Sequence, residues 1–253
     1  MKKLFLGLIL VFLLFPLFAQ ERQVIHVMVA LCDNKYQGIV KVPKGIGNGQ
    51  DPNSNLYWGC GYGMRTMFRK SADWKEVRRD KVDSIRLERI VFKHKIKNYY
   101  LVADAYNGQY IKRCTEDFLN SCAGVKKDTL MVGSTILGLN GNARLVSYVG
   151  HNGLMDFKLS NIYQNKDGKQ RDAIIIACAS KQYFSPYLYA AKAKPLVWST
   201  HLMSAEAYTV YDAVMAYING QSDEQIREAA AAAYNRYQKC GIKAARRLLV
   251  TGF

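Results

Sequence analysis

The sequence predicts an α/β fold, with a mostly parallel sheet that carries helices on both faces. Several short apolar runs are rich in β-branched residues and end at glycines or polar turns, which is typical of buried parallel strands. Segments with apolar residues at helical spacing separate most of these runs. The chain has 253 residues, of which 49% are hydrophobic, and no repeat or linker interrupts it. We therefore expect residues 20–253 to form a single domain with a full core.

The first half of the chain begins with the apolar run from Val24 to Leu31, which predicts a strand ending near Asp33 and Asn34. Residues 38–55 are rich in Gly, Pro and Asn, and we expect a surface or lid loop there. Apolar residues at helical spacing predict a helix over 55–70. Apolar and charged residues alternate over 83–96, which indicates an extended segment with one wet face.

The remaining strands are predicted from apolar runs, and the remaining helices from apolar residues at helical spacing. Four apolar runs predict buried strands, at residues 99–105, 143–150, 172–177 and 195–200. Helical spacing predicts helices at residues 105–123, 204–219 and 222–237, and the last of these begins with a capping box. Residues 154–171 are long enough for a right-handed crossover between parallel strands, and residues 242–250 indicate a last short helix or strand.

The amino-terminal segment predicts a secretory signal peptide over residues 1–19. Met1-Lys2-Lys3 precedes an apolar run over 4–18 and the small residue Ala19. The alternative is an uncleaved anchor, but the run is shorter than the ~20 residues that span a bilayer and contains Pro16. We expect an exported protein, periplasmic or extracellular, with no stable membrane span after cleavage.

Charge gives a weaker indication of partners. The formal net charge is +16, and loss of Lys2 and Lys3 with the signal peptide would lower it to +14. Such a charge favours polyanionic surroundings, for example an envelope surface. The lysines and arginines are scattered and no nucleic-acid-binding module is recognisable, so we expect no specific nucleic-acid partner.

The cysteine and histidine patterns do not indicate a metal site or another cofactor. The chain has six cysteines but no C-x-x-C pair, and its four histidines form no dense cluster. Cys114 and Cys122 lie eight residues apart on one predicted helix, about 12 Å, which is too far for a disulfide between them.

The strongest functional signal is a histidine and a cysteine at equivalent positions. His151 and Cys178 each come just after an apolar run. In an open parallel sheet, ligands bind at the carboxyl ends of the strands. A cysteine needs a base or a positive neighbour to become a thiolate, and histidine is the usual supplier. The alternative is packing, since cysteine is among the most buried residue types.

The two segments resemble those of cysteine peptidases of the caspase, legumain and gingipain type. In that family one apolar strand ends in His-Gly and the next ends in Ala-Cys. The matching segments here are Tyr148-Val149-Gly150-His151-Asn152-Gly153 and Ile174-Ile175-Ile176-Ala177-Cys178-Ala179-Ser180. The second is similar to the legumain-type Ala-Cys-x-Ser. Asn152 departs from the pattern, because it separates the histidine from the glycine.

The resemblance implies a caspase-like fold and a peptide or protein substrate. His151 would be the general base and acid, Cys178 the nucleophile, and the backbone N–H groups of Cys178 and Gly153 the oxyanion donors. Further candidate substrate-binding residues near the same crevice are Asp33, Asn34, Asp156, Ser180 and His201. Asp156 is also a candidate to orient His151. Two alternatives remain: a non-catalytic, envelope-associated binding protein with a basic surface, or another Cys–His acyl or amide transferase.

Overall fold

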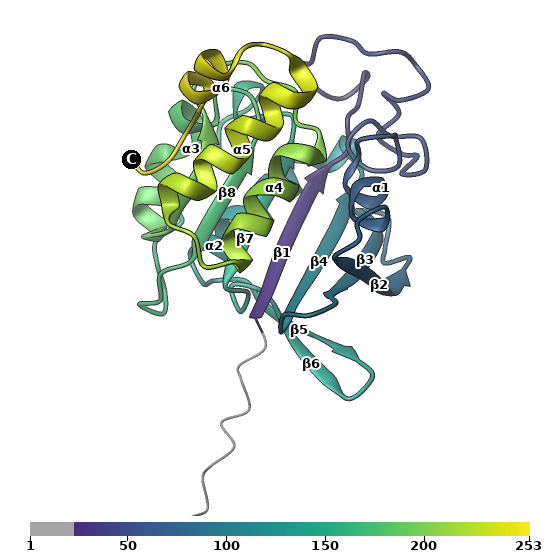
Figure 1. Cartoon of the computed structure of the whole chain (residues 1–253), viewed down its shortest axis with the longest axis vertical. Helices are drawn as coiled ribbons and strands as arrows, with labels where there is room; N and C mark the ends of the chain where they lie inside the picture. Colours follow the sequence, from purple (N-terminus) through teal and green to yellow (C-terminus); the bar gives the residue numbers. More distant parts are fainter. Residues whose placement is uncertain (1–22) are drawn as a thin grey trace, which may run out of the picture.

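One eight-stranded sheet runs through the computed structural model, which describes residues 23–253 (Figure 1). Its strands are β1 (Gln23–Ala30), β2 (Trp74–Asp80), β3 (Arg86–His94), β4 (Tyr99–Tyr106), β7 (Leu145–Gly150), β8 (Asp172–Ile176), β9 (Lys194–Ser199) and β10 (Leu249–Val250). Their order is β10-β9-β8-β7-β1-β4-β3-β2. The five strands from β9 to β4 are mutually parallel, and β10, β3 and β2 add antiparallel edges.

Helices cover both faces of this sheet, which confirms the predicted fold class. One face carries α1 (Met64–Arg69), α4 (Ala207–Ile218) and α5 (Asp223–Gln238). The other carries α2 (Ile111–Cys122) and α3 (Ser180–Ala191), which lie behind the sheet in Figure 1. Helix α6 (Ile242–Leu248) packs against α5. The predicted signal peptide lies outside the described residues, and no helix within residues 23–253 is both long and apolar enough to cross a bilayer.

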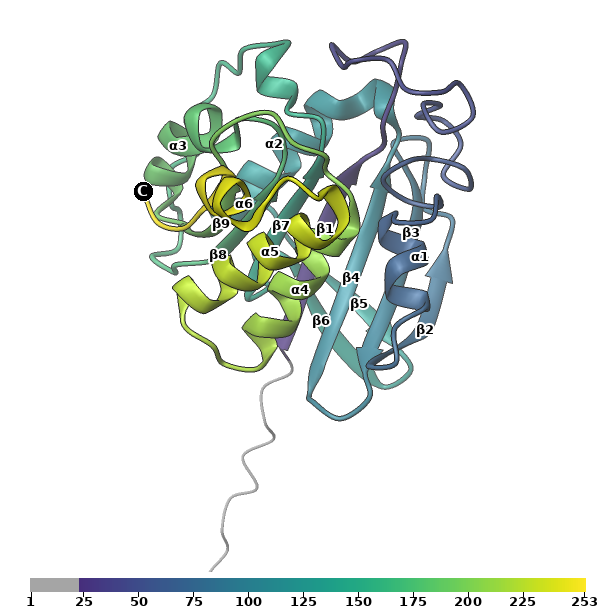
Figure 2. The ribbon, with the colours of Figure 1, turned by 45° about the horizontal axis from the view of Figure 1, so that its top comes forward.

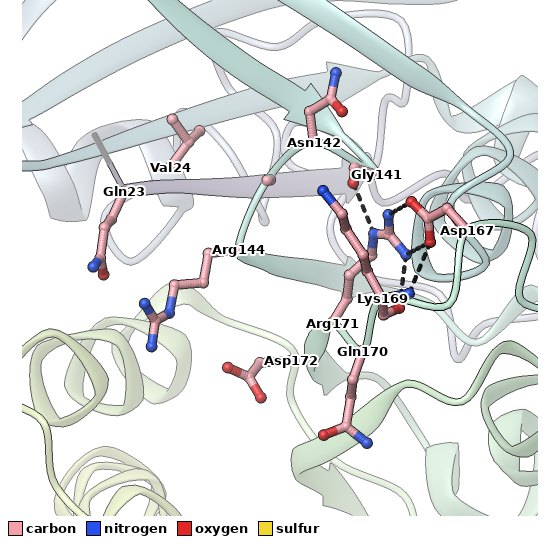
Figure 3. Close-up of a pocket in the computed structure, with 11 residues that line it drawn as sticks. Gln23, Val24, Gly141, Asn142, Arg144, Asp167, Lys169, Gln170, Arg171 and Asp172 are labelled. Atoms are coloured by element: carbon pink, nitrogen blue, oxygen red, sulfur yellow. Dashed lines mark hydrogen bonds and ion pairs between the residues drawn. The ribbon is translucent and has the colours of Figure 1, made fainter. Parts of the chain in front are cut away.

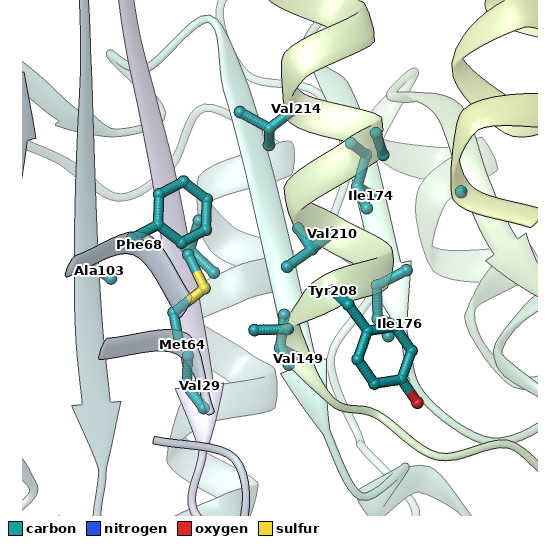
Figure 4. Close-up of a cluster of buried hydrophobic side chains, with 14 of the residues drawn as sticks. Val29, Met64, Phe68, Ala103, Val149, Ile174, Ile176, Tyr208, Val210 and Val214 are labelled. Atoms are coloured by element: carbon teal, nitrogen blue, oxygen red, sulfur yellow. The ribbon is translucent and has the colours of Figure 1, made fainter. Parts of the chain in front are cut away.

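The alternation of strand side chains divides the core into two layers. In β1, Ile25, Val27 and Val29 enter one layer, whereas Val24 and Met28 enter the other. Figure 4 shows the first layer, in which side chains of α1 and α4 meet those of the sheet. Because β1 is buried on both faces, its sequence is a nearly continuous apolar run.

The predicted helix over 55–70 is wrong in its first half, since helix α1 begins only at Met64. A Cβ on Gly59 would lie 1.9 Å from the carbonyl oxygen of Asn53, so the backbone packs too closely there for any other residue. The Asn55 side chain bonds both N–H and C=O of Cys32, at 3.1 and 2.8 Å. These contacts hold an irregular turn against the end of β1 in place of a helix.

Two elements were not predicted from the sequence. Strand β2 is an edge strand in which charged residues mask the β pattern. Strands β5 (Lys127–Val132) and β6 (Thr135–Asn140) form a separate hairpin, in which Met131 and Ile136 remain exposed. The carboxyl end of β2 lies at the same edge of the sheet as those of the parallel strands, since Asp80 pairs with Arg89 and Arg89 pairs with Asp104 of β4.

The parallel strands end at one edge of the sheet, where their following segments gather. The long loop after β1 and the segment after β7 both lie at this edge, in the upper part of Figures 1 and 2. The first of these segments corresponds to the predicted lid loop. The edge therefore brings together parts of the chain that are more than 100 residues apart.

Candidate active site

Strand register brings the histidine and the cysteine to adjacent positions. Strands β7 and β8 are paired in parallel, and Val149 lies opposite Ile176. His151 and Cys178 each follow this pair by two residues in the chain. Both residues line one cavity of about 510 Å³. The other lining residues are Gly38, Ile39, Val40, Tyr57, Gly150, Met155, Leu202, Met203, Ser204 and Tyr234.

Cys178 lies at a sharp turn between β8 and α3. The next residue, Ala179, has φ +46°, a left-handed conformation that costs a non-glycine residue of order 1–3 kcal/mol. The Ala179 N–H donates to the His201 carbonyl at 2.8 Å, which helps to hold this conformation. The turn leaves Cys178 half-buried, two residues before the first residue of α3. Cys178 thus lies beside the amino terminus of α3, where the free backbone N–H groups of a helix attract negatively charged groups of a ligand.

The sulfur itself contacts the backbone of the segment after β9. Sγ of Cys178 accepts the Met203 N–H at 3.3 Å and lies 3.3 Å from the Met203 carbonyl oxygen. Within residues 23–253 no hydrogen bond joins this sulfur to His151. Catalytic hydrogen bonds are often long in the absence of substrate and tighten in the Michaelis complex, so this geometry is compatible with a Cys–His pair.

His151 is oriented through its Nε2 atom, which lies 2.8 Å from Oδ2 of Asp156. A carboxylate only accepts hydrogen bonds, so this contact assigns the proton to Nε2 and leaves Nδ1 as the basic nitrogen. The Tyr148 hydroxyl donates to the His151 carbonyl at 2.7 Å and fixes the backbone. The Asn152 side chain donates to the Cys178 carbonyl at 2.7 Å. Asn152, the departure from the family pattern, thus ties the histidine segment to the cysteine segment.

Asp156 also connects the histidine to the loop after β1. Its Oδ2 accepts the Gly38 N–H at 2.9 Å. A Cβ on Gly38 would lie 2.3 Å from Oδ1 of Asp156, so only glycine fits there without displacement. One carboxylate therefore holds both the His151 imidazole and the cavity wall formed by residues 38–40.

The predicted oxyanion donor Gly153 is not among the residues that line the cavity. Its backbone group hydrogen-bonds the Tyr148 hydroxyl, a contact that opposes the rise in the pKa of Tyr148 caused by burial. A Cβ on Gly153 would lie 2.7 Å from the Phe157 ring and 3.2 Å from Ile111. For Gly153 to bind an oxyanion, the contact with Tyr148 would have to break.

Asp33 and Asn34 follow β1 but shape the loop rather than line the cavity. Oδ1 of Asp33 accepts the backbone N–H of Lys35 at 2.8 Å, and its Oδ2 accepts from Gln50 at 2.6 Å. The Asn34 amide exchanges two hydrogen bonds with the backbone of Val42. The structure brings both residues to the predicted edge of the sheet, where their side chains are used for loop structure.

Ser180 and His201 lie near Cys178 in the chain or in space, but neither lines the cavity. Ser180 is fully buried, and its hydroxyl contacts the Ile175 carbonyl at 3.2 Å. His201 is exposed, and its Nδ1 lies 2.9 Å from the Thr200 hydroxyl. Their contacts favour structural roles at the start of α3 and at the end of β9.

Several lining residues were missed by the sequence analysis. Met203 and Ser204 follow β9, and the rule that ligands bind past strand carboxyl ends could have indicated them. Tyr57 lies in the segment mistaken for a helix. Tyr234 lies in the middle of α5, where nothing in the local sequence distinguishes it from a core residue.

A second hollow, of about 600 Å³, lies at the opposite end of the sheet, beside the first residues of β1 and β8 (Figure 3). It has no cysteine or histidine among its lining residues. Its buried Arg171 donates to the Gly141 carbonyl at 2.7 Å and pairs with Asp167. These partners satisfy the Arg171 guanidinium, and the hollow lacks the cysteine and histidine that line the first cavity.

Comparison with protein-family models, with curated proteins and with solved structures finds no match to this chain. Function is therefore inferred from the geometry of the His151–Cys178 cavity.

Proposed function

We propose that this chain is an exported cysteine peptidase or related amide hydrolase of the caspase-like type, with Cys178 as nucleophile and His151 as general base and acid. The observation that supports this most directly is the shared cavity, which both side chains line from the carboxyl ends of adjacent parallel strands. The Cys178 thiol is partly exposed, so a substrate can reach it. Cys–His pairs act on amide and peptide bonds in other enzymes, which also agrees with the proposal.

In the first half-reaction, Sγ of Cys178 attacks the carbonyl carbon of the substrate amide while Nδ1 of His151 accepts the thiol proton. A sulfur–carbon bond forms, and the tetrahedral intermediate then collapses. The carbon–nitrogen bond breaks, and His151 transfers the proton to the leaving amine. The products are a free amine and a thioester on Cys178.

In the second half-reaction, His151 removes a proton from a water molecule that attacks the thioester carbonyl. The carbon–sulfur bond breaks, the carboxylic product leaves, and the proton returns to sulfur. Throughout both halves Asp156 keeps the proton on Nε2, so that Nδ1 carries the lone pair needed for each transfer. The backbone N–H of Cys178 is the oxyanion donor in this proposal.

A peptide-library hydrolysis assay tests the proposal, with Cys178→Ala against Cys240→Ala. Cys240 is an exposed cysteine outside the cavity, so its substitution removes a thiol without touching the site. We expect Cys178→Ala to abolish turnover and Cys240→Ala to retain it. Turnover that survives in Cys178→Ala would rule out the cysteine mechanism.

A non-catalytic binding protein is the second candidate, favoured by one observation. The sulfur of Cys178 is hydrogen-bonded by the Met203 backbone rather than by the imidazole. In that case the basic surface, with its formal net charge of +16, would bind an envelope polyanion. An acyl or amide transferase would use the same two residues, and transfer to an added amine in place of water would identify it.

A further inference from the structure

A carboxylate without a cationic partner lies behind one wall of the cavity. Glu206 directly precedes α4 and is half-buried. Its Oε2 accepts hydrogen bonds from the hydroxyls of Ser204 at 2.9 Å and Tyr208 at 3.2 Å. Ser204 itself lines the cavity beside Cys178. The Ser204 hydroxyl therefore links this carboxylate to the wall of the cavity.

Two tyrosines, Tyr57 and Tyr234, line the same cavity as Ser204. The hydroxyl of Tyr234 accepts the Ser204 N–H at 3.2 Å. Burial raises the pKa of both Tyr57 and Tyr234, and the electrostatic interaction with Glu206 adds to each rise. Ser204 therefore contacts Tyr234 of the cavity wall through its backbone and Glu206 through its hydroxyl.

Glu206 has no ion-pair partner among residues 23–253. No lysine, arginine or histidine nitrogen in this part of the chain forms an ion pair with it, and its Oε1 accepts no hydrogen bond from these residues. No lysine or arginine lines the cavity, although the chain has 36 of them. A partly desolvated carboxylate without a counter-charge is costly, and a cation that reached it would lower that cost.

We propose that this cavity receives a cationic side chain, arginine or lysine, from the substrate residue on the acyl side of the bond attacked by Cys178, with Glu206 as the recognised charge. The inference rests on the hydrolase proposal and names its substrate class. Oε1 of Glu206 provides the charge-assisted hydrogen bond, and the hydroxyls of Ser204 and Tyr234 provide neutral acceptors for the remaining donors of a guanidinium. The apolar walls formed by Tyr57 and Met203 suit the methylene stem of such a side chain.

A pair of peptidyl chloromethyl ketones that differ only in arginine against citrulline tests the inference. Citrulline keeps the shape of arginine but lacks its charge. The measurement is the second-order rate of covalent modification of Cys178, followed by mass spectrometry on the full chain. We expect the arginine probe to react at least about tenfold faster, because a hydrogen bond between charged groups contributes that much to binding. In Glu206→Gln this preference should fall to about threefold or less.

Glu224→Gln is the matched control, because it removes the same charge from an exposed glutamate at the start of α5, outside the cavity. It should keep the preference for the arginine probe. Equal rates for the two probes in the unmodified chain, or an unchanged preference in Glu206→Gln, would overturn the cation subsite and leave the hydrolase proposal intact. Failure of both probes to modify Cys178 would overturn the hydrolase proposal, and the subsite with it.

Discussion

Nε2 of His151 lies 2.8 Å from Oδ2 of Asp156, and the same oxygen accepts the Gly38 N–H at 2.9 Å. The imidazole and the wall of the cavity are therefore fixed by one carboxylate. Asp156 is five residues after His151, on the turn that closes a short 3-10 helix over Gly153–Met155. This arrangement makes Asp156 a positioning residue for the proposed base.

Asp156→Asn is expected to lower kcat by about 10²-fold or more, because an amide can donate to Nε2 and stabilise the tautomer with its proton on Nδ1. The measurement is the pH profile of kcat and KM with a cleaved peptide. Asp83→Asn, in an exposed turn before β3, is the control and should behave like the unmodified chain. An unchanged pH profile in Asp156→Asn would exclude its role in orienting the histidine.

Gly38→Ala is expected to lower kcat/KM by about tenfold or more, because its Cβ would displace the Asp156 carboxylate that holds His151. Gly45→Ala is the matched control in the same loop, since a Cβ there meets no atom within 4 Å. Activity assays of both variants beside thermal unfolding separate the site effect from a loss of stability. Equal activities of the two variants would contradict the coupling.

Ala179→Gly is expected to raise the free energy of unfolding by up to about 1 kcal/mol, because it relieves the left-handed conformation at φ +46°. Ala232→Gly, in the middle of α5, should lower it by about 1 kcal/mol, since glycine is a poor helix former. Chemical denaturation measures both values. Destabilisation of similar size in the two variants would show that the turn at Cys178 is not strained.

Stability should fall in acid partly through Asp167. Hydrogen bonding from Arg171 lowers the pKa of the Asp167 carboxyl well below its usual range. A carboxyl group with a lowered pKa in the folded state contributes stability that is fully present above its unfolded pKa, about 4. That contribution is lost as the pH falls further. Denaturation between pH 6 and pH 3 should therefore show a shallower loss in Asp167→Asn, and parallel curves for the two proteins would refute this.

The sheet could be predicted because its parallel strands are buried on both faces. Apolar runs such as 143–150 and 172–177 are stable only in the interior of a sheet. The ends of these runs therefore indicated correctly where His151 and Cys178 lie in the fold. Predictions failed where backbone contacts override residue propensity. The helix predicted over 55–70 begins only at Met64, because the backbone of Asn53 packs against Gly59 and residue propensity does not reveal this contact.

The rest of the candidate site could not be predicted because its walls come from distant segments. Tyr57, Ser204 and Tyr234 belong to three separate parts of the chain, and packing of α5 against the sheet brings the last of them to the cavity. Nothing in the sequence around Gly38 indicates its contact with Asp156, 118 residues away.

The central claim, that Cys178 and His151 form a reactive pair, is tested most directly by iodoacetamide labelling at pH 6.5, mapped for each cysteine by mass spectrometry. The exposed Cys240 is an internal reference, and Cys32, whose pKa burial raises to about 12, marks the unreactive limit. We predict that iodoacetamide labels Cys178 at least about tenfold faster than Cys240, and that His151→Ala abolishes this difference in rate. Labelling of Cys178 that is no faster than that of Cys240, and that does not change in His151→Ala, would contradict the claim.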